Sequence, residues 1–156
     1  MEALVTDLDQ LECALAPTDG RPLVVHHFAT WCDPCEEELP ILADLLRGAD
    51  VRRVAVTWDL FMVPVGPDEA ARVCSAFLER LGGGFDLLCV YTGAPDALFR
   101  SQGISEGTVP FTDVRDGAGR VVERFPMPLF EEDDRRRFAA AVRSAAADHD
   151  DGGRAT

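Results

Sequence analysis

Short apolar runs and segments of helical period alternate along most of the chain. The runs have the length and apolar content of strands that are buried on both faces of a sheet. Between them, apolar residues recur every three to four positions, as they do on the buried face of a helix. We expect strands at residues 4–5, 23–29, 51–57, 85–91, 110–116 and 120–125. We expect helices at residues 7–16, 32–47, 68–81, 95–101 and 130–147.

This alternation continues without an internal repeat or a dividing linker. Gly117-Ala-Gly119 separates the last two expected strands, which is typical of a hairpin turn. The pattern therefore predicts one α/β domain over residues 1–147. Residues 148–156 lack an apolar side chain able to dock them on that domain, so we expect a disordered acidic tail there.

Composition and charge limit the classes of partner. The chain has 156 residues, of which 47% are hydrophobic, and this suffices for one domain with a sizeable core. It carries 28 acidic and 15 basic residues, for a net charge of −13, whereas a nucleic-acid surface needs clustered basic residues. We therefore expect no nucleic-acid binding.

The expected location follows from the apolar runs and the first residues. No run approaches the roughly 18 residues that span a bilayer, so we expect no membrane span. Met1 is followed by Glu2 and Asp7, whereas a signal peptide begins with positive charge. The sequence as written predicts a cytoplasmic protein, or a periplasmic one if a signal peptide has been removed.

Five cysteines are too few and too scattered for a disulfide-stapled scaffold, and only Cys32 and Cys35 lie close together. Half of a zinc site is an alternative for this pair, but the sequence has no second close pair of ligands. We expect Cys13 and Cys89 to be small buried apolar residues. Cys74 is expected to be half-exposed on a helix, with a third redox role as an alternative to a structural one.

Cys32 and Cys35 stand between a buried strand and the start of a helix. The free N–H groups and the dipole at a helix N-terminus stabilise a thiolate at Cys32. Cys35 lies one helical turn further, close enough to form a disulfide. This spacing predicts that Cys32 attacks a disulfide and that Cys35 resolves the mixed disulfide, with no cofactor beyond the redox-active Cys32–Cys35 pair.

A strand, then Trp31-Cys-Asp-Pro-Cys35, then a helix with Pro40 five residues further resembles the thioredoxin superfamily. Thr108-Val109-Pro110 is similar to the family's cis-proline segment. The sequence motif Ala29-Thr-Trp-Cys32 resembles the TlpA-like and ResA-like branch of the family, and so do the additional helix and strand within residues 59–101. The resemblance implies a three-layer α/β fold, with a central mixed β-sheet and helices on both faces.

The resemblance also implies a thiol-disulfide oxidoreductase that acts on protein disulfides and thiols and is recharged by an upstream reductase or electron donor. A monomer is expected. The implied catalytic residues are Cys32 and Cys35, and the implied substrate-binding residues are Trp31, Asp33, Pro34, Thr108, Val109 and Pro110.

His26 is one departure from the family, because thioredoxins have a buried Asp six residues before the first cysteine. A histidine there has two interpretations: it takes the proton of Cys35 during exchange, or it is a hydrogen-bonded core residue. His27 is expected to be structural. A second departure is the pair Asp113 and Arg115 in a strand, which must be either exposed or paired.

The third departure is the acidic run Glu36-Glu-Glu38. Acids in a first helical turn favour the helix in any case. Together with Asp33 they also disfavour a thiolate at Cys32, so we expect a reducing dithiol and a protein that works as a reductant.

Two alternatives stay open. One is a thioredoxin-fold binding or scaffold module whose cysteines do not turn over. The other is an electron donor to a separate peroxidase. The chain itself does not fit a peroxidase, because Val25 and Ala29 stand where peroxiredoxins have Pro and Thr before their reactive cysteine.

Overall fold

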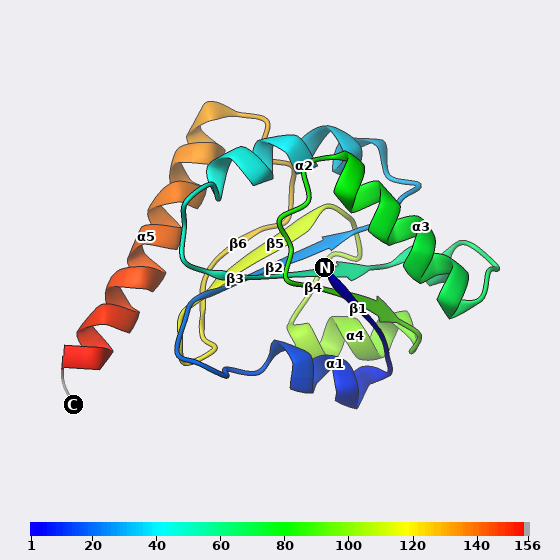
Figure 1. The fold of residues 1–156 in the computed structure, drawn as a ribbon, viewed down its shortest axis with the longest axis horizontal. Helices are drawn as coiled ribbons and strands as arrows, with labels where there is room; N and C mark the ends of the chain where they lie inside the picture. The colour runs from blue at the N-terminus through cyan, green and yellow to red at the C-terminus, as the bar shows by residue number, and fades with distance from the viewer. Residues whose placement is uncertain (155–156) are drawn as a thin grey trace.

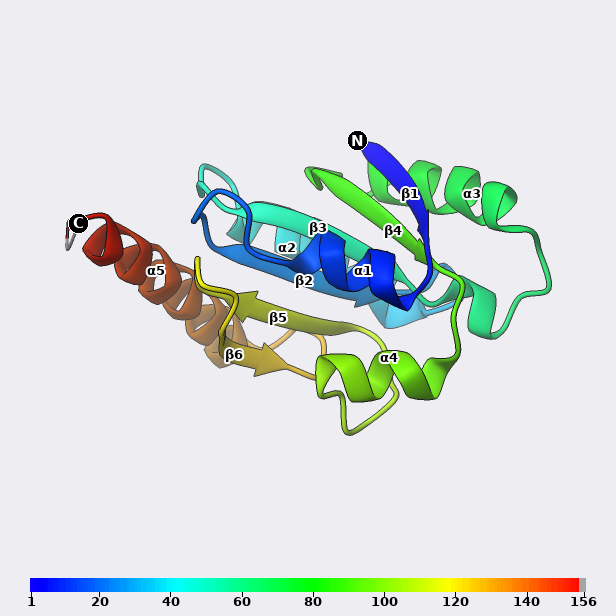
Figure 2. The same ribbon diagram turned by 90° about the horizontal axis from the view of Figure 1, so that it is seen from below.

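The structure, a computed structural model, describes the backbone of residues 1–154 and the side chains of residues 1–147. Six strands form one sheet in the order β1-β4-β3-β2-β5-β6 (Figure 2). The first four in that order pair in parallel, and β5 and β6 are antiparallel to their neighbours, so the sheet is mixed as expected. The strands are β1 (Glu2–Thr6), β2 (Leu23–Phe28), β3 (Arg52–Thr57), β4 (Leu87–Tyr91), β5 (Phe111–Arg115) and β6 (Val121–Phe125).

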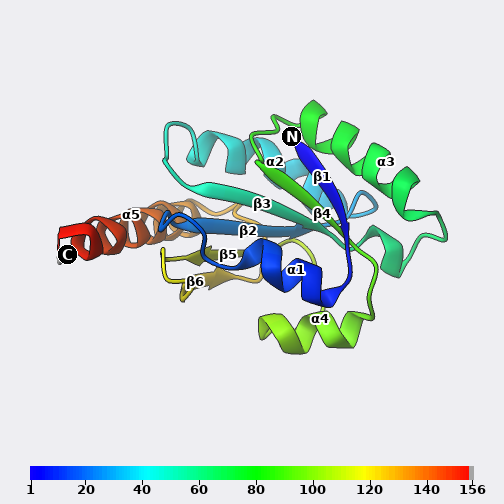
Figure 3. The ribbon, with the colours of Figure 1, turned by 60° about the horizontal axis from the view of Figure 1, so that its bottom comes forward.

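Helices cover both faces of this sheet. Figure 1 shows α2 and α3 on one side and α1 and α4 on the other, and Figure 3 shows the same division from a second direction. The last helix, α5, packs against β5 and β6. The expected three-layer α/β fold, with a mixed sheet between helices on both faces, is thus confirmed. The helices are α1 (Leu8–Leu15), α2 (Asp33–Leu45), α3 (Pro67–Arg80), α4 (Pro95–Gln102) and α5 (Glu132–Arg154).

The expected elements are present, with small shifts at their ends. The strand expected from residue 85 begins at Leu87, which pairs with Glu2 of β1. Phe85 is buried beside the sheet, where its ring stacks on that of His26, so its apolar character reflects core packing. The sequence pattern did not predict the short 3-10 helix η1 (Asp59–Phe61) that follows β3.

The topology brings two distant segments to one edge of the sheet. All six residues of the central strand β2 are buried, and the chain leaves β2 through residues 29–31 into α2. Because β5 runs antiparallel to β2 and Phe111 pairs with His27, Pro110 lies at the end of β2 from which the cysteines follow.

Two further predictions concern the ends and the membrane. Among the described residues, no helix is long and apolar enough to cross a bilayer. The backbone of α5 is described as helical to Arg154, seven residues beyond the expected end at residue 147. The side chains of residues 148–154 and all of residues 155–156 lie outside the described part of the chain, and the disordered tail over residues 148–156 stays a prediction.

Candidate active site

Cys32 is the N-cap of α2. Its backbone is extended (φ −101°, ψ 107°), and its Sγ accepts a hydrogen bond from the N–H of Cys35 at 3.3 Å. The second helical position is Pro34, which has no N–H to offer, so the amide of Cys35 is the one that faces the sulfur. Cys32 is 7% exposed and Cys35 is fully buried, and both are free thiols. A first thiol with a small exposed fraction and a fully buried second thiol one turn away suit attack followed by resolution.

The cis-proline segment meets this turn. The Val109–Pro110 peptide bond is cis, and the thiol of Cys32 donates to the carbonyl of Val109 at 3.6 Å. Pro110 is buried, Val109 is half-buried and Thr108 is exposed. The structure therefore brings together two parts of the predicted site that lie 77 positions apart in the chain.

The remaining predicted substrate-binding residues lie on the surface around Cys32. Trp31 is 44% exposed although it is one of the largest side chains, and Asp33 and Pro34 are exposed as well. An exposed aromatic side chain beside a reactive thiol is available for contact with a partner.

The thiol of Cys35 is held in its protonated form. Burial, the hydrogen bond with Cys32 and the nearby charge of Glu38 raise the pKa of Cys35 far above its usual value, and the backbone of Ala29 opposes this only in part. Cys35 therefore needs a base to remove its proton before it can resolve a mixed disulfide.

Glu38 lies one turn after Cys35 and is fully buried. Its Oε2 accepts a hydrogen bond from the amide of Leu129 at 2.7 Å, whereas its Oε1 has no hydrogen-bond partner among the described residues. Burial raises the pKa of this carboxyl to about 7, and the Leu129 amide opposes the shift. A buried carboxyl that titrates near neutrality beside a buried thiol can accept the proton of that thiol.

The acidic run that the sequence suggested is thus divided among three environments. Glu36 forms an ion pair with Arg80 at 3.1 Å, Glu37 is exposed, and Glu38 is buried. Sequence reasoning missed the different role of Glu38. The available signal was helical spacing, because Glu38 stands three residues after Cys35 and four before Leu42, and all three share one face of α2.

His26 is fully buried beside Glu38. Its Nδ1 lies 2.9 Å from Thr112 Oγ1 and 3.7 Å from Glu38 Oε1. Burial lowers the pKa of His26 to about 3, so the ring is neutral near pH 7. His27 points to the opposite face of the sheet, where its Nδ1 accepts a hydrogen bond from Trp58 Nε1 at 3.0 Å.

Asp113 and Arg115 are both buried, and they are paired, which is the second of the two possibilities that the sequence left open. Asp113 contacts Arg115 at 3.1 Å and Arg124 at 3.2 Å, and Arg115 also donates to Gln102 at 2.7 Å. This network joins β5 and β6 to the end of α4, from which the cis-proline segment departs.

The other cysteines are distributed differently from the prediction. Cys13 is exposed, so its predicted burial is wrong, because α1 buries Leu11 and Leu15 on another face. Cys74 is buried, so its predicted half-exposure is wrong, and its thiol donates to Thr57 Oγ1 at 3.3 Å. Cys89 is buried in β4 as expected. Among residues 1–147, no three His, Cys, Asp or Glu side chains gather as metal ligands, and the prediction of a cofactor-free site stays a prediction.

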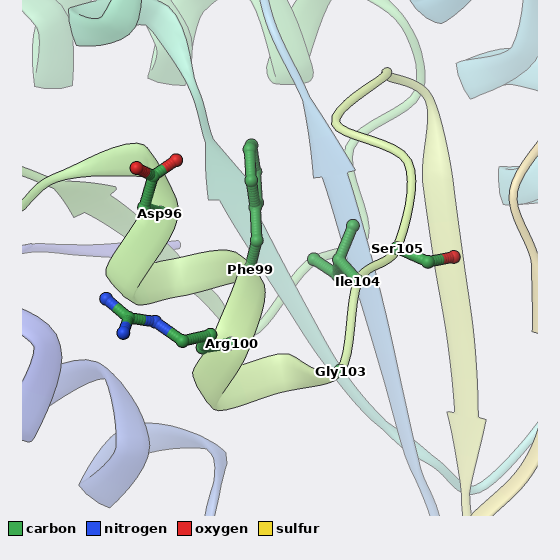
Figure 4. A pocket seen from close by; sticks show the side chains of 6 residues that line it. All are labelled: Asp96, Phe99, Arg100, Gly103, Ile104 and Ser105. Carbon is green, nitrogen blue, oxygen red and sulfur yellow. The ribbon is translucent and has the colours of Figure 1, made fainter.

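A shallow pocket of about 580 Å³ lies along α4 and the segment that follows it (Figure 4). None of the predicted site residues lines this pocket. Its lining residues are Asp96, Phe99, Arg100, Gly103, Ile104 and Ser105.

Comparison with known proteins finds relatives whose names describe thiol-disulfide chemistry, in agreement with the paired thiols of this site. No family model matches the chain. It is 32% identical over 116 residues to the thiol:disulfide interchange protein HelX of Rhodobacter capsulatus, which covers 73% of this chain and 57% of HelX. It is 26% identical over 125 residues to the thiol-disulfide oxidoreductase ResA of Bacillus thuringiensis, which covers 78% of this chain and 64% of ResA. The chain therefore spans less than two thirds of the length of either relative.

A solved structure supports the fold. StoA from Bacillus subtilis matches with a TM-score of 0.57 at 18% sequence identity, covering 80% of this chain and 84% of that one. At 18% identity this match supports the fold alone. The sequence matches to HelX and ResA indicate which branch of proteins with this fold the chain resembles. The chain belongs to the thioredoxin superfamily and to its ResA-like branch.

Proposed function

We propose that this protein is a thiol-disulfide oxidoreductase that reduces disulfide bonds in other proteins. One observation carries the proposal, namely the position of Cys32 at a helix N-terminus beside the cis-proline. Its sulfur accepts a hydrogen bond from the amide of Cys35 and donates one to the carbonyl of Val109. A scaffold module has no need of two thiols arranged in this way, and the relatives named above are thiol-disulfide oxidoreductases and interchange proteins.

The first step is attack by the Cys32 thiolate on a substrate disulfide. A bond forms between Cys32 Sγ and one substrate sulfur, the substrate S–S bond breaks, and the other substrate sulfur leaves as a thiolate that takes a proton from water. Trp31 and the Thr108–Pro110 segment are the surfaces that we assign to contact the substrate chain.

The second step releases the substrate. Cys35 gives its proton to a base, and its thiolate attacks Cys32 Sγ, so that the Cys32–Cys35 disulfide forms and the second substrate sulfur leaves as a thiolate. The substrate has gained two electrons and the protein has lost them. A dithiol reductant of the upstream class must then return the protein to its reduced form.

We assign the base to Glu38 and not to His26. A base is most effective when its pKa lies near the operating pH, and burial brings the carboxyl of Glu38 to about 7 but lowers His26 to about 3. Cys35 and Glu38 stand three residues apart on the buried face of α2, which places the two side chains next to each other. The neutral ring of His26 instead lies between Thr112, with which it forms a hydrogen bond, and Glu38.

We propose the reducing direction because Asp33 adds negative charge at the first turn of α2, where it disfavours a thiolate. Donation of electrons to a separate peroxidase would use the same two thiols and is the second candidate. The monomeric state, the upstream reductant and the compartment remain predictions from the sequence.

Cysteine variants test the proposal. Cys32→Ser is expected to abolish reduction of insulin disulfides, and Cys35→Ser is expected to accumulate a mixed disulfide with the substrate on Cys32. Cys13→Ser is the matched control, because Cys13 is exposed on α1 and should leave the rate unchanged. The proposal is wrong if Cys32→Ser reduces insulin as fast as the unmodified protein and Cys35→Ser traps nothing.

A further inference from the structure

Asp59 is a buried carboxylate that the proposed mechanism does not use. It begins η1, directly after β3, and it is 3% exposed. No basic side chain among residues 1–147 forms an ion pair with it. Its charge is instead held by hydrogen bonds from two threonines, and such charge-assisted bonds are among the stronger ones in proteins.

Two of these hydrogen bonds come from Thr30. The backbone N–H of Thr30 donates to Asp59 Oδ1 at 2.8 Å, and the hydroxyl of Thr30 donates to Asp59 Oδ2. The hydroxyl of Thr57, at the end of β3, donates to Oδ1 at 2.8 Å. Asp59 thus joins the end of one strand to the segment that leaves another.

Thr30 is part of the turn that carries the first thiol. The N–H of Cys32 donates to the carbonyl of Ala29 at 3.3 Å, so residues 29–32 form a tight turn with Thr30 inside it. The backbone of Ala29 also contributes to the environment of the Cys35 thiol. Whatever fixes Thr30 therefore fixes the position of Cys32 relative to Cys35.

The segment around Asp59 also contacts the other side of the site. The ring of Trp58 lies 5.2 Å from that of Phe99 in α4, and the ring of Phe61 lies 6.2 Å from it. A Cβ at Gly107 would come within 2.8 Å of Phe99, so this ring lies directly against the backbone that leads into the cis-proline. The same short helix therefore supports both the cysteine turn and the cis-proline segment.

We propose that Asp59 is a positioning residue for the redox pair: through its two hydrogen bonds to Thr30, it holds the turn of residues 29–32 in the geometry that closes the Cys32–Cys35 disulfide. The inference rests on the proposed oxidoreductase function. A fixed turn lowers the ordering cost of ring closure, because the two sulfurs need little rearrangement to reach bonding geometry. Loss of the bonds makes the disulfide harder to form.

The test is the equilibrium constant for disulfide formation from the dithiol and oxidised glutathione. Asp59→Asn is expected to lower this constant about tenfold, in line with the loss of hydrogen bonds to a charged group. Thr30→Val, which removes the hydroxyl bond without changing any charge, is expected to lower it about threefold to fivefold. Thr30→Ser keeps both bonds and is expected to restore the constant.

A matched control separates this role from general destabilisation. Asp116 is also a buried loop carboxylate, and it accepts the backbone N–H groups of Ala118 and Arg120 at 2.9 Å each, at the far end of β5. Asp116→Asn is expected to lower the urea midpoint of unfolding as Asp59→Asn does, but to leave the glutathione equilibrium constant unchanged.

The outcomes are distinct. If Thr30→Val keeps the unmodified constant, an effect in Asp59→Asn alone comes from its charge, and the positioning role is refuted. If Asp116→Asn shifts the constant as far as Asp59→Asn, the role is refuted as well. If the unmodified protein forms no Cys32–Cys35 disulfide with glutathione, the proposed function itself fails. Should Asp59→Asn not fold, the comparison of Thr30→Val with Thr30→Ser decides alone.

Discussion

Glu38 Oε1 lies 3.7 Å from His26 Nδ1, and both side chains are fully buried. The histidine is neutral near pH 7, because burial lowers its pKa to about 3, so it does not balance a charge on Glu38. The carboxyl consequently changes between its neutral and ionised forms near pH 7. The Glu38 carboxyl is therefore a titrating group that lies next to Cys35 and is shielded from solvent.

The release step should depend on Glu38. In a Cys13→Ser background, Cys32 is loaded with a coloured thiol by reaction with an aromatic disulfide, and release of that thiol by Cys35 is followed by absorbance. The release rate should rise with pH through an inflection near 7 as Glu38 ionises. Glu38→Gln should remove the inflection and slow release at pH 8 about a hundredfold, the usual scale of general base catalysis.

Glu37→Gln is the control for this experiment. Glu37 precedes Glu38 in the same helix but is exposed, so its replacement changes the net charge equally without touching the buried site. Its release rate and inflection should match those of the unmodified protein. An unchanged profile in Glu38→Gln would remove the carboxyl from the mechanism.

Protein stability should fall as Glu38 ionises. Its pKa is raised in the folded state from 4.5 to about 7, so the folded protein binds this proton more tightly than the unfolded chain does. The stabilisation is fully present below pH 4.5 and is lost as pH rises to about 7, which amounts to at most about 3 kcal/mol. Urea unfolding of Glu38→Gln should lack this loss between pH 5 and 8, relative to Glu37→Gln.

Stability should also fall on the acid side, because of the histidines. Burial lowers the folded-state pKa of His26 and of His27 from 6.5 to about 3, so the unfolded chain binds these protons more tightly. Their contribution is present above pH 6.5 and is lost as pH falls towards 3, by at most about 5 kcal/mol each. The loss from the two histidines and the opposite loss from Glu38 balance close to neutrality, so the stability maximum should lie near pH 7.

His26→Asn tests this prediction by urea unfolding at pH 4.5 and 6.5. The variant keeps a polar partner for Thr112 but has no group that titrates in this range. It should lose less unfolding free energy between the two pH values than the unmodified protein. An equal loss in both proteins would show that His26 does not contribute to acid destabilisation.

Local sequence patterns predicted the parts of the site that depend on neighbouring residues. The strand before Cys32 and the helix after it predicted the position of the cysteine pair. The residues Thr108-Val109-Pro110 themselves predicted the cis-proline segment. Glu38 was not singled out, although its helical spacing from Cys35 and Leu42 indicated a buried position, because its hydrogen-bond partner Leu129 lies 91 positions further along the chain. Asp59 was missed for the same reason, since its partner Thr30 lies in a different loop. The exposure of Cys13 was missed because an eight-residue helix offers few positions from which to judge its buried face.

Charge beside the first thiol should set the direction of the redox reaction. Asp33 occupies the first helical position after Cys32 and has no ion-pair partner among residues 1–147, whereas the charge of Glu36 is balanced by Arg80. Asp33→Asn removes a negative charge that disfavours a Cys32 thiolate, so the reduced form becomes more stable and the dithiol less reducing. We expect the equilibrium constant for oxidation by glutathione disulfide to fall about threefold in Asp33→Asn, and less in Glu36→Gln. The effect should shrink in 1 M salt, because exposed charges are screened. A constant for the unmodified protein as low as that of an enzyme that introduces disulfides would contradict the reducing direction, and a larger effect in Glu36→Gln than in Asp33→Asn would contradict its assignment to Asp33.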